Sequence, residues 1–217
     1  MKNLHLGVVL LGIAALVSCN KGNVNTHAAK GSIEGYTRVN QGNYDKLTSN
    51  HTEGGILEEG FAKDESKEGT WLKYDKEGNL IGITSYMDGK INGPSIEMNN
   101  RGQITRKQYF LDDVPHGIYG DYKFGRATKE VNYKNGEMDG MYKEFYNNGE
   151  LQRSINYKNG VMDGVYKEFY NNGKLQRSIN YTNGVMDGPM KYYNEEGGVT
   201  LEYSFKNGEK VGEGVMK

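Results

Sequence analysis

The feature that most constrains this chain is a segment of 24 residues that occurs twice in direct succession. Residues 140–163 read GMYKEFYNNGELQRSINYKNGVMD, and residues 164–187 read GVYKEFYNNGKLQRSINYTNGVMD. Self-similarity at such a period is the signature of repeat architectures, in which each unit packs only on its neighbours. Because a catalytic site usually needs one asymmetric arrangement, literal repetition indicates a surface built by stacking one unit.

Glycine carries the same register over most of the chain. One set of glycines runs from Gly69 to Gly212 in steps of 24 residues, with a single step of 23. Two further sets keep this spacing, which implies two turns in every unit. The first set is Gly69, Gly93, Gly117, Gly140, Gly164, Gly188 and Gly212.

Aromatic and branched apolar residues occupy fixed positions between these glycines. Tyr133, Tyr157 and Tyr181 share one position of the unit, while Phe145 and Phe169 share another. Segments of 7 to 10 residues that are rich in tyrosine, isoleucine and valine and bounded by glycine turns are typical of strands. No apolar period of 3.6 follows the signal-like segment. The sequence therefore predicts an all-β meander of hairpins.

The first loop of each unit has glycine as its third residue, as in residues 147–149. A two-residue type I′ turn would force a positive φ on Glu77 or Arg101 in equivalent loops, whereas a three-residue loop requires it only at glycine. We therefore predict three-residue loops. The alternative register, with two-residue turns, would place Glu144 opposite Arg153, a pairing that contributes a few tenths of a kcal/mol, on the order of other cross-strand pairs.

The other turns follow the same reasoning. The second loop, residues 158–160, is predicted to have three residues as well, and the short unit a two-residue turn at Phe124 and Gly125. Gly140 and its equivalents fall inside strands, where we expect a bulge. With this register one sheet face would carry Phe145, Leu151, Ile155 and Tyr157, and the other face Tyr142, Glu144 and Tyr146.

The N-terminal segment has the pattern of an export signal. Lys2 precedes an apolar run from Leu6 to Val17, which is shorter than the roughly 20 residues of a membrane-spanning helix. The sequence Leu-Val-Ser-Cys that ends at Cys19 resembles the lipobox of bacterial lipoproteins, whose cysteine is acylated. The alternative is an ordinary signal peptide with a chance cysteine. Cys19 is the only cysteine, so an intrachain disulfide is excluded.

Four parts are therefore expected along the chain. Residues 1–18 form a signal peptide, and residues 19–44 a lipidated cysteine with a flexible polar tether. Residues 45–68 form a degenerate repeat, and residues 69–217 the regular β-hairpin repeats. In some lipoproteins an acidic cluster just after the cysteine resembles a signal for export to the cell surface, and the segment after Cys19 lacks such a cluster. We therefore expect a membrane-anchored, extracytoplasmic lipoprotein that faces the periplasm rather than the cell surface.

Charge and composition exclude several classes of function. The 27 basic and 28 acidic residues give a net charge of −1. No basic stripe indicates binding of nucleic acid, and no polybasic patch indicates binding of anionic lipid. Membrane attachment would rest on the acyl chains of the lipidated cysteine alone.

Chemistry-bearing residues are sparse. A nucleophile needs a positioned base, and the only histidines beyond the signal segment are His27, His51 and His116. Residues 112–116, Asp-Asp-Val-Pro-His, contain metal-ligand residue types, but turn chemistry explains them better. The recurring Asp139, Asp163 and Asp187 are too isolated for calcium sites, so we expect them to bond in turns or bulges. We predict no enzyme activity, metal site or cofactor.

Aromatic residues that recur with the period are the candidate binding residues. Exposed tyrosines with polar tips suit both protein interfaces and sugar stacking. The alternative role is to cover the second face of a thin sheet that has no other core, and both roles can hold together. The candidates are Trp71, Tyr119, Tyr142, Tyr146, Tyr166 and Tyr170.

The repeat pattern resembles a known repeat class. Gly-x-Tyr-Lys-Glu-Phe-Tyr-Asn-Asn-Gly-x-Leu, followed by Tyr-x-Asn-Gly-x-x-x-Gly, is similar to the bacterial variant of the membrane occupation and recognition nexus (MORN) repeat, from Gly69 to Gly212. The resemblance implies an elongated, curved, single-layer sheet of stacked hairpins that is used in binding. Asp113 in place of a turn glycine and Ser95 in place of an aromatic residue depart from the pattern.

Three functions agree with these observations. The first is a lipid-anchored scaffold that holds an unknown protein partner on its tyrosine-rich curved sheet. The second is an antitoxin-like protein that neutralises a partner by direct binding, because the resemblance includes bacterial proteins labelled antitoxin components. The third is a protein that binds glycan or cell wall, although Trp71 is the only tryptophan.

Overall fold

The computed structural model describes residues 33–216, and all regular structure in this range is β. The strands form one open antiparallel sheet of 18 strands, which confirms the predicted all-β meander. The strands are β1 (Thr37–Gln41), β2 (Tyr44–Asn50), β3 (Ile56–Lys63), β4 (Ser66–Tyr74), β5 (Leu80–Met87), β6 (Lys90–Met98), β7 (Ile104–Leu111), β8 (Val114–Pro115), β9 (Gly117–Lys123), β10 (Arg126–Lys134), β11 (Glu137–Phe145), β12 (Leu151–Lys158), β13 (Val161–Met162), β14 (Gly164–Phe169), β15 (Leu175–Thr182), β16 (Val185–Tyr193), β17 (Val199–Lys206) and β18 (Glu209–Met216).

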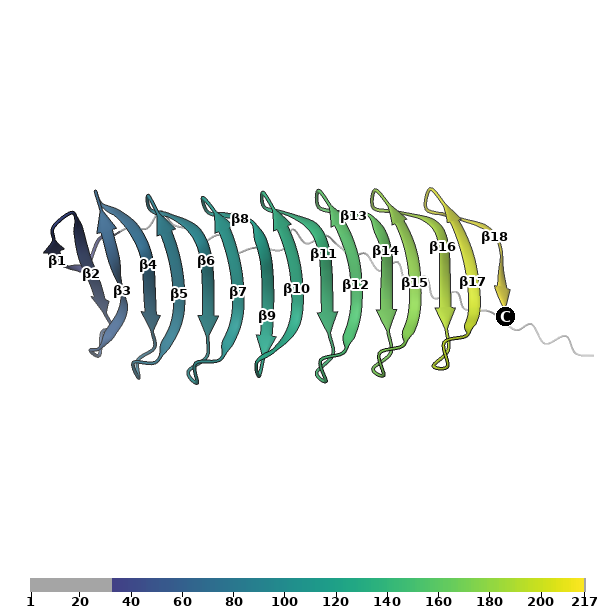
Figure 1. Cartoon of the computed structure of the whole chain (residues 1–217), viewed down its shortest axis with the longest axis horizontal. Coiled ribbons are helices and arrows are strands. Elements are labelled where there is room, and N and C mark those ends of the chain that lie inside the picture. Colours follow the sequence, from purple (N-terminus) through teal and green to yellow (C-terminus); the bar gives the residue numbers. More distant parts are fainter. Residues whose placement is uncertain (1–32, 217) are drawn as a thin grey trace, which may run out of the picture.

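Most strands pair with the strands beside them in the chain. The short strands β8 and β13 lie at bends, so β7 also pairs with β9 and β12 also pairs with β14. Figure 1 shows the result, an elongated and curved single layer with the two kinds of turn along its two long sides. Strands β1 and β18 are the edges of the sheet.

The first loops have three residues, as the glycine position predicts. In residues 147–149 the amide of Tyr146 donates to the carbonyl of Glu150 at 2.8 Å, and the amide of Gly149 donates back to the carbonyl of Tyr146 at 2.9 Å. Gly149 has a φ of 93°. Glycine adopts this left-handed conformation without steric cost, so the third loop position requires it.

A bulge in the following strand changes the register. Phe145 lies opposite Leu151, but the next pair is Glu144 with Arg153, so Gln152 has no partner of its own. The three-residue loop and the Glu144–Arg153 pair, which we treated as alternatives, therefore occur together. The prediction that Tyr142 and Ile155 lie on different faces is wrong, because the bulge places them opposite each other on one face.

The second loops have two residues, so the prediction of three is wrong. Lys158 pairs with Val161, and the two residues between them, Asn159 and Gly160, have φ values of 48° and 79°. These values are those of a type I′ turn, whose twist matches that of the flanking strands. Asparagine tolerates a positive φ, so the strain that excludes two-residue turns at glutamate or arginine does not arise here. The predicted two-residue turn at Phe124 and Gly125 is confirmed.

The glycines inside strands mark bulges, as predicted. Gly140 has a φ of 108°, and the pairing of β10 with β11 shifts register between Val131 and Tyr133. Two of the recurring aspartates accept hydrogen bonds from the second loop of the next unit, along one long side of the sheet. The carboxylate of Asp139 accepts from the amide of Asn159 at 3.2 Å, and that of Asp163 from the amide of Asn183 at 3.4 Å.

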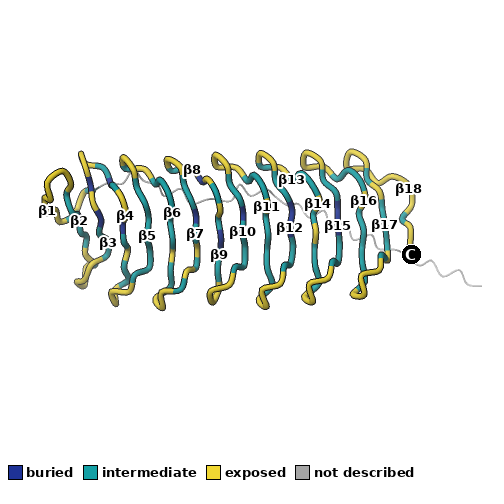
Figure 2. Tube along the Cα trace, viewed as in Figure 1, coloured by how far each residue is buried: buried dark blue, intermediate teal, exposed yellow. Residues whose placement is uncertain are grey.

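The thickest part of the core lies near the N-terminal end of the described sheet. Leu47, Ala62 and Trp71 are buried there on β2, β3 and β4, and Tyr36 packs against them. The expectation of a tether up to residue 44 is wrong for its last residues, because β1 pairs with β2 and Tyr36 packs against this core. The polar composition of this segment gave no indication that Tyr36 packs against Trp71. Figure 2 shows that most buried residues elsewhere lie in short stretches along the middle of the strands, with a further buried stretch at the bend of β8.

Candidate binding face

One face of the sheet carries a repeated set of three side chains, which we call the ladder face. Each set holds a tyrosine, a carboxylate two residues later on the same strand, and an arginine opposite that carboxylate on a paired strand. Residues two apart on a strand point to the same face, so all three side chains lie together. The sets are Tyr119, Asp121 and Arg106; Tyr142, Glu144 and Arg153; and Tyr166, Glu168 and Arg177.

The first set is fully connected by hydrogen bonds. The hydroxyl of Tyr119 lies 2.8 Å and 2.7 Å from the two carboxylate oxygens of Asp121. Nε of Arg106 donates to the Tyr119 hydroxyl and to Oδ1 of Asp121, both at 3.0 Å. A charged network of this kind orients a tyrosine hydroxyl and an arginine fork at the surface.

The other two sets repeat the ion pair with small differences. The hydroxyl of Tyr142 donates to Glu144. Nε of Arg153 lies 2.6 Å from Oε2 of Glu144 without satisfying hydrogen-bond geometry, so this contact is an ion pair. Nη2 of Arg177 lies 2.7 Å from Oε2 of Glu168.

Burial and the neighbouring carboxylates change the titration of Tyr119 and Tyr142. Burial, with a hydrogen bond to Asp121, raises the pKa of Tyr119 to about 12. Burial and the hydrogen bond to Glu144 also raise the pKa of Tyr142. The hydroxyls therefore stay protonated at neutral pH and act as neutral hydrogen-bonding groups, not as bases.

Part of each tyrosine ring covers the sheet. Val131 and Ile155, which lie opposite Tyr142 on its two neighbouring strands, are 1% and 3% exposed. The tyrosines are only half buried, and Lys129 extends between them, with Nζ 5.7 Å from the ring centroid of Tyr119 and 5.5 Å from that of Tyr142. The covering role and an accessible surface thus coexist at the same residues.

Three of the predicted binding residues have structural roles. Trp71 is 2% exposed, so its predicted surface role is wrong. Tyr146 and Tyr170 each reach the next unit, where the hydroxyl of Tyr146 donates to the carbonyl of Phe169 and that of Tyr170 to the carbonyl of Tyr193, both at 2.7 Å. These two tyrosines tie neighbouring first loops together.

Removing one of these hydroxyls should lower stability. Tyr146→Phe leaves the carbonyl of Phe169 without this donor, so we expect the free energy of unfolding to fall by about 1 kcal/mol. Urea denaturation followed by circular dichroism measures the change. Tyr44→Phe is the matched control, because Tyr44 is 44% exposed and should change the stability little. Equal effects of the two substitutions would contradict the bridging role.

Histidines and aspartates do not assemble a metal site within residues 33–216. Asp113 lies in a turn and accepts a hydrogen bond from the amide of Ile91 at 2.7 Å. Nδ1 of His116 accepts from the amide of Asn135 at 3.5 Å, and Nε2 of His51 contacts the carbonyl of Tyr74 at 3.2 Å. His27 and Cys19 lie outside the described residues.

Comparisons with known proteins identify the repeat. The family model described as MORN repeat variant matches residues 67–88, 138–159, 162–183 and 186–207. Solved structures of TarM are similar over 72% and 70% of this chain, with 8% identity and a TM-score of 0.25 for each, and one of them is the S. aureus protein. This chain covers 22% of each of those chains. No curated protein matches the sequence.

Residues 33–216 contain no helix that is long and apolar enough to span a bilayer.

Proposed function

We propose that this protein is a lipid-anchored, extracytoplasmic scaffold that binds a protein partner on its ladder face. The observation that carries the proposal is the recurrence of one tyrosine, one carboxylate and one arginine opposite that carboxylate, on the same face of three successive units. The arginine comes from the preceding strand in the first set and from the following strand in the other two. Tyrosine and arginine dominate the energetically important positions of protein interfaces. The role needs no catalytic residue.

The spacing of the sets suits an extended partner surface. Successive tyrosines are two strands apart, which corresponds to about 10 Å because neighbouring strands lie about 4.8 Å apart. Tyr142 and Tyr166 therefore present the same groups at regular intervals, with Arg153 on the strand between them. Since the salt bridges fix the arginine side chains before binding, little side-chain entropy would be lost on association.

Within residues 33–216, no specific contact favours the two alternative functions. Glycan binding through stacked aromatic rings would depend most on Trp71, whose ring is buried. The antitoxin-like role differs from the scaffold role only in what happens to the partner, and no side-chain arrangement in the described part of the chain distinguishes between them. The scaffold is therefore the function that we carry forward.

Anchoring through Cys19 gives a separate prediction. Cys19→Ser should move the protein from the membrane fraction to the soluble fraction, because about 0.8 kcal/mol of membrane binding per buried acyl CH₂ group would be lost. Cell fractionation and incorporation of labelled palmitate would both report the change. Retention of the serine variant on membranes after a high-salt wash would contradict lipid anchoring.

In-cell crosslinking of the tagged, full-length protein tests partner binding. After affinity purification we expect one dominant partner protein, identified by mass spectrometry. Recovery of wall fragments without a dominant protein would contradict the scaffold and favour glycan binding.

A further inference from the structure

The short unit departs from the repeat at one loop. Its turn has two residues, Phe124 and Gly125, where regular units have three. Ala127 stands at the position that leucine holds in residues 151 and 175, and Lys123 stands at the position of Tyr146 and Tyr170. The deletion and the alanine both remove volume from the same corner of the sheet.

Lys123 also lacks the structural role that its position has in the other units. Tyrosine at this position bridges to the next unit, as described for Tyr146. Asparagine or aspartate at this position instead forms a hydrogen bond within its own loop. The carboxylate of Asp75 accepts from the backbone amide of Asn79 at 2.8 Å, and Oδ1 of Asn99 accepts from the backbone amide of Gln103 at 3.0 Å. The structure assigns neither contact to Lys123, so its amine is available to a ligand.

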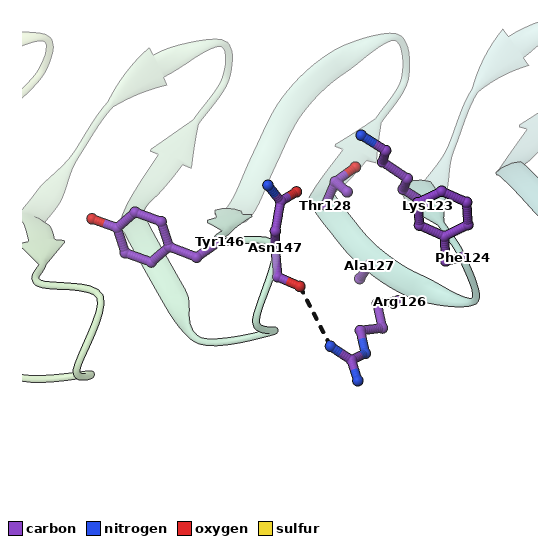
Figure 3. Close-up of a pocket in the computed structure, with 7 residues that line it drawn as sticks. All are labelled: Lys123, Phe124, Arg126, Ala127, Thr128, Tyr146 and Asn147. Atoms are coloured by element: carbon purple, nitrogen blue, oxygen red, sulfur yellow. Dashed lines mark hydrogen bonds between the residues drawn. The ribbon is translucent and has the colours of Figure 1, made fainter.

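A pocket of about 310 Å³ opens at this corner, a volume at the lower end of ligand sites. One long hydrogen bond crosses it, from Nη1 of Arg126 to the carbonyl of Asn147 at 3.4 Å (Figure 3). The pocket lies between β9, β10 and the first loop of the next unit. Its lining residues are Lys123, Phe124, Arg126, Ala127, Thr128, Tyr146 and Asn147.

The charges of the pocket are unbalanced. Within residues 33–216, neither Lys123 nor Arg126 has a carboxylate oxygen within 4.0 Å of its charged nitrogens. The three arginines of the ladder face are all paired with carboxylates, at 3.0 Å in the case of Arg106. The pocket therefore holds two exposed cations, one of which is a guanidinium that suits the geometry of a carboxylate.

Phe124 adds an apolar contact beside the cations. Its side chain is 77% exposed, and its ring centroid lies 5.8 Å from Nζ of Lys123. Its φ of 52° belongs to the left-handed region, which costs roughly 1 kcal/mol or more for a residue with a side chain. The turn thus presents an exposed aromatic ring beside the two cations, where an apolar group of a ligand could contact it.

From this combination we infer that the pocket binds an acidic peptide segment, in which one carboxylate meets Lys123, a second carboxylate meets Arg126 and a neighbouring apolar side chain meets Phe124, since the two cationic groups extend apart (Figure 3). This inference rests on the proposed function, since the segment would belong to the protein partner. It adds a second contact site at the loop side of the sheet, separate from the tyrosine, carboxylate and arginine sets. Phosphate groups would satisfy the two cations but would not use the exposed ring.

A peptide titration tests the inference without the partner. The full-length protein in detergent is mixed with a fluorescein-labelled octapeptide that alternates glutamate and leucine, and anisotropy is measured. We expect saturable binding that weakens at least tenfold in the double variant Lys123→Gln and Arg126→Gln, and severalfold in Phe124→Asn. Asparagine is chosen because it adopts the turn conformation readily, so the fold should be kept.

The controls separate this pocket from general charge. The double variant Lys134→Gln and Lys167→Gln removes the same charge elsewhere and should bind the peptide like the original protein. A peptide with glutamine in place of glutamate should not bind. Equal binding by the pocket variant and the original protein would overturn the inference. So would pocket-dependent binding of phosphatidylglycerol vesicles or inorganic phosphate without peptide binding. Because the titration uses no partner, its failure leaves the crosslinking test of the scaffold unaffected.

Discussion

Trp71→Ala is expected to lower the free energy of unfolding by about 4 kcal/mol, because truncation of a buried tryptophan removes apolar contacts and leaves a cavity. Trp71 packs edge-on against Tyr36, with ring centroids 5.4 Å apart, and its Nε1 donates to the carbonyl of Phe61 at 3.0 Å. Nζ of Lys67 lies 3.8 Å from the centroid of the Trp71 ring and 3.0 Å from Oε1 of Glu58. The substitution would thus also remove the aromatic ring that faces the buried ammonium group of Lys67.

Trp71→Ala should unfold the strands around residue 71 before the rest of the sheet unfolds. Repeat sheets are held by contacts between neighbouring units, so the strands around Trp71 should open at lower denaturant concentration than the rest. Hydrogen exchange measured by mass spectrometry would show faster exchange in β1 to β4 than in β14 to β17. Trp71→Phe is the control, and it should lose less stability because it keeps an aromatic ring. A loss below 1 kcal/mol in Trp71→Ala would contradict the assigned core.

Alkaline pH should destabilise the protein strongly between pH 10 and 12. Burial raises the pKa of Tyr86 and of Tyr119 to about 12, against the usual 10.0, so the folded protein keeps protons that the unfolded chain loses. The stabilisation is therefore fully present below pH 10 and is lost as the pH rises to 12. A full difference of two in pKa corresponds to ~2.7 kcal/mol, and solvent screening of these half-exposed groups reduces it to roughly 1 kcal/mol each.

Several tyrosines should act together in this transition. Burial also raises the pKa of Tyr36, Tyr133 and Tyr181. Ultraviolet absorbance of tyrosinate, recorded with circular dichroism during a pH titration, measures ionisation and unfolding at once. Tyr119→Phe should make the stability less dependent on pH in this window. A free energy of unfolding that stays constant from pH 10 to 12 would contradict the assigned environments.

The sequence determined the architecture because the repeat itself fixes it. Glycine positions located every unit, and the steric cost of a positive φ at Glu77 and Arg101 identified the three-residue loops. The one-residue deletion near Phe124 correctly indicated a shorter turn. These features depend on local backbone sterics, which a short stretch of sequence expresses completely.

Features that depend on register or on distant contacts were missed. The bulge at Gln152 has no residue signature of its own, and it moved Tyr142 to the face of Ile155. The predicted length of the second loops was wrong because asparagine tolerates a positive φ, which is costly for glutamate. The burial of Trp71 depends on Tyr36, which lies 35 positions earlier in a polar segment.

The candidate face was predictable in part. Tyr119, Tyr142 and Tyr166 were identified from their spacing, and the structure places all three on the ladder face. Their arginine partners were not identified, because the register that pairs Glu144 with Arg153 was set aside in favour of the loop. The opposition of Glu144 and Arg153 would have identified these arginines, since the same pair recurs in the next unit as Glu168 with Arg177.

Face-resolved crosslinking tests the central proposal most directly. A photoreactive amino acid at Lys129 would lie between the tyrosines of the ladder face, and the same amino acid at Lys167 would lie on the other face, opposite Ser178. In cells that carry the full-length protein, we expect one dominant crosslinked protein from position 129 and little or none from position 167. Equal crosslinking from both positions, or none from position 129, would contradict binding of a protein partner on the ladder face.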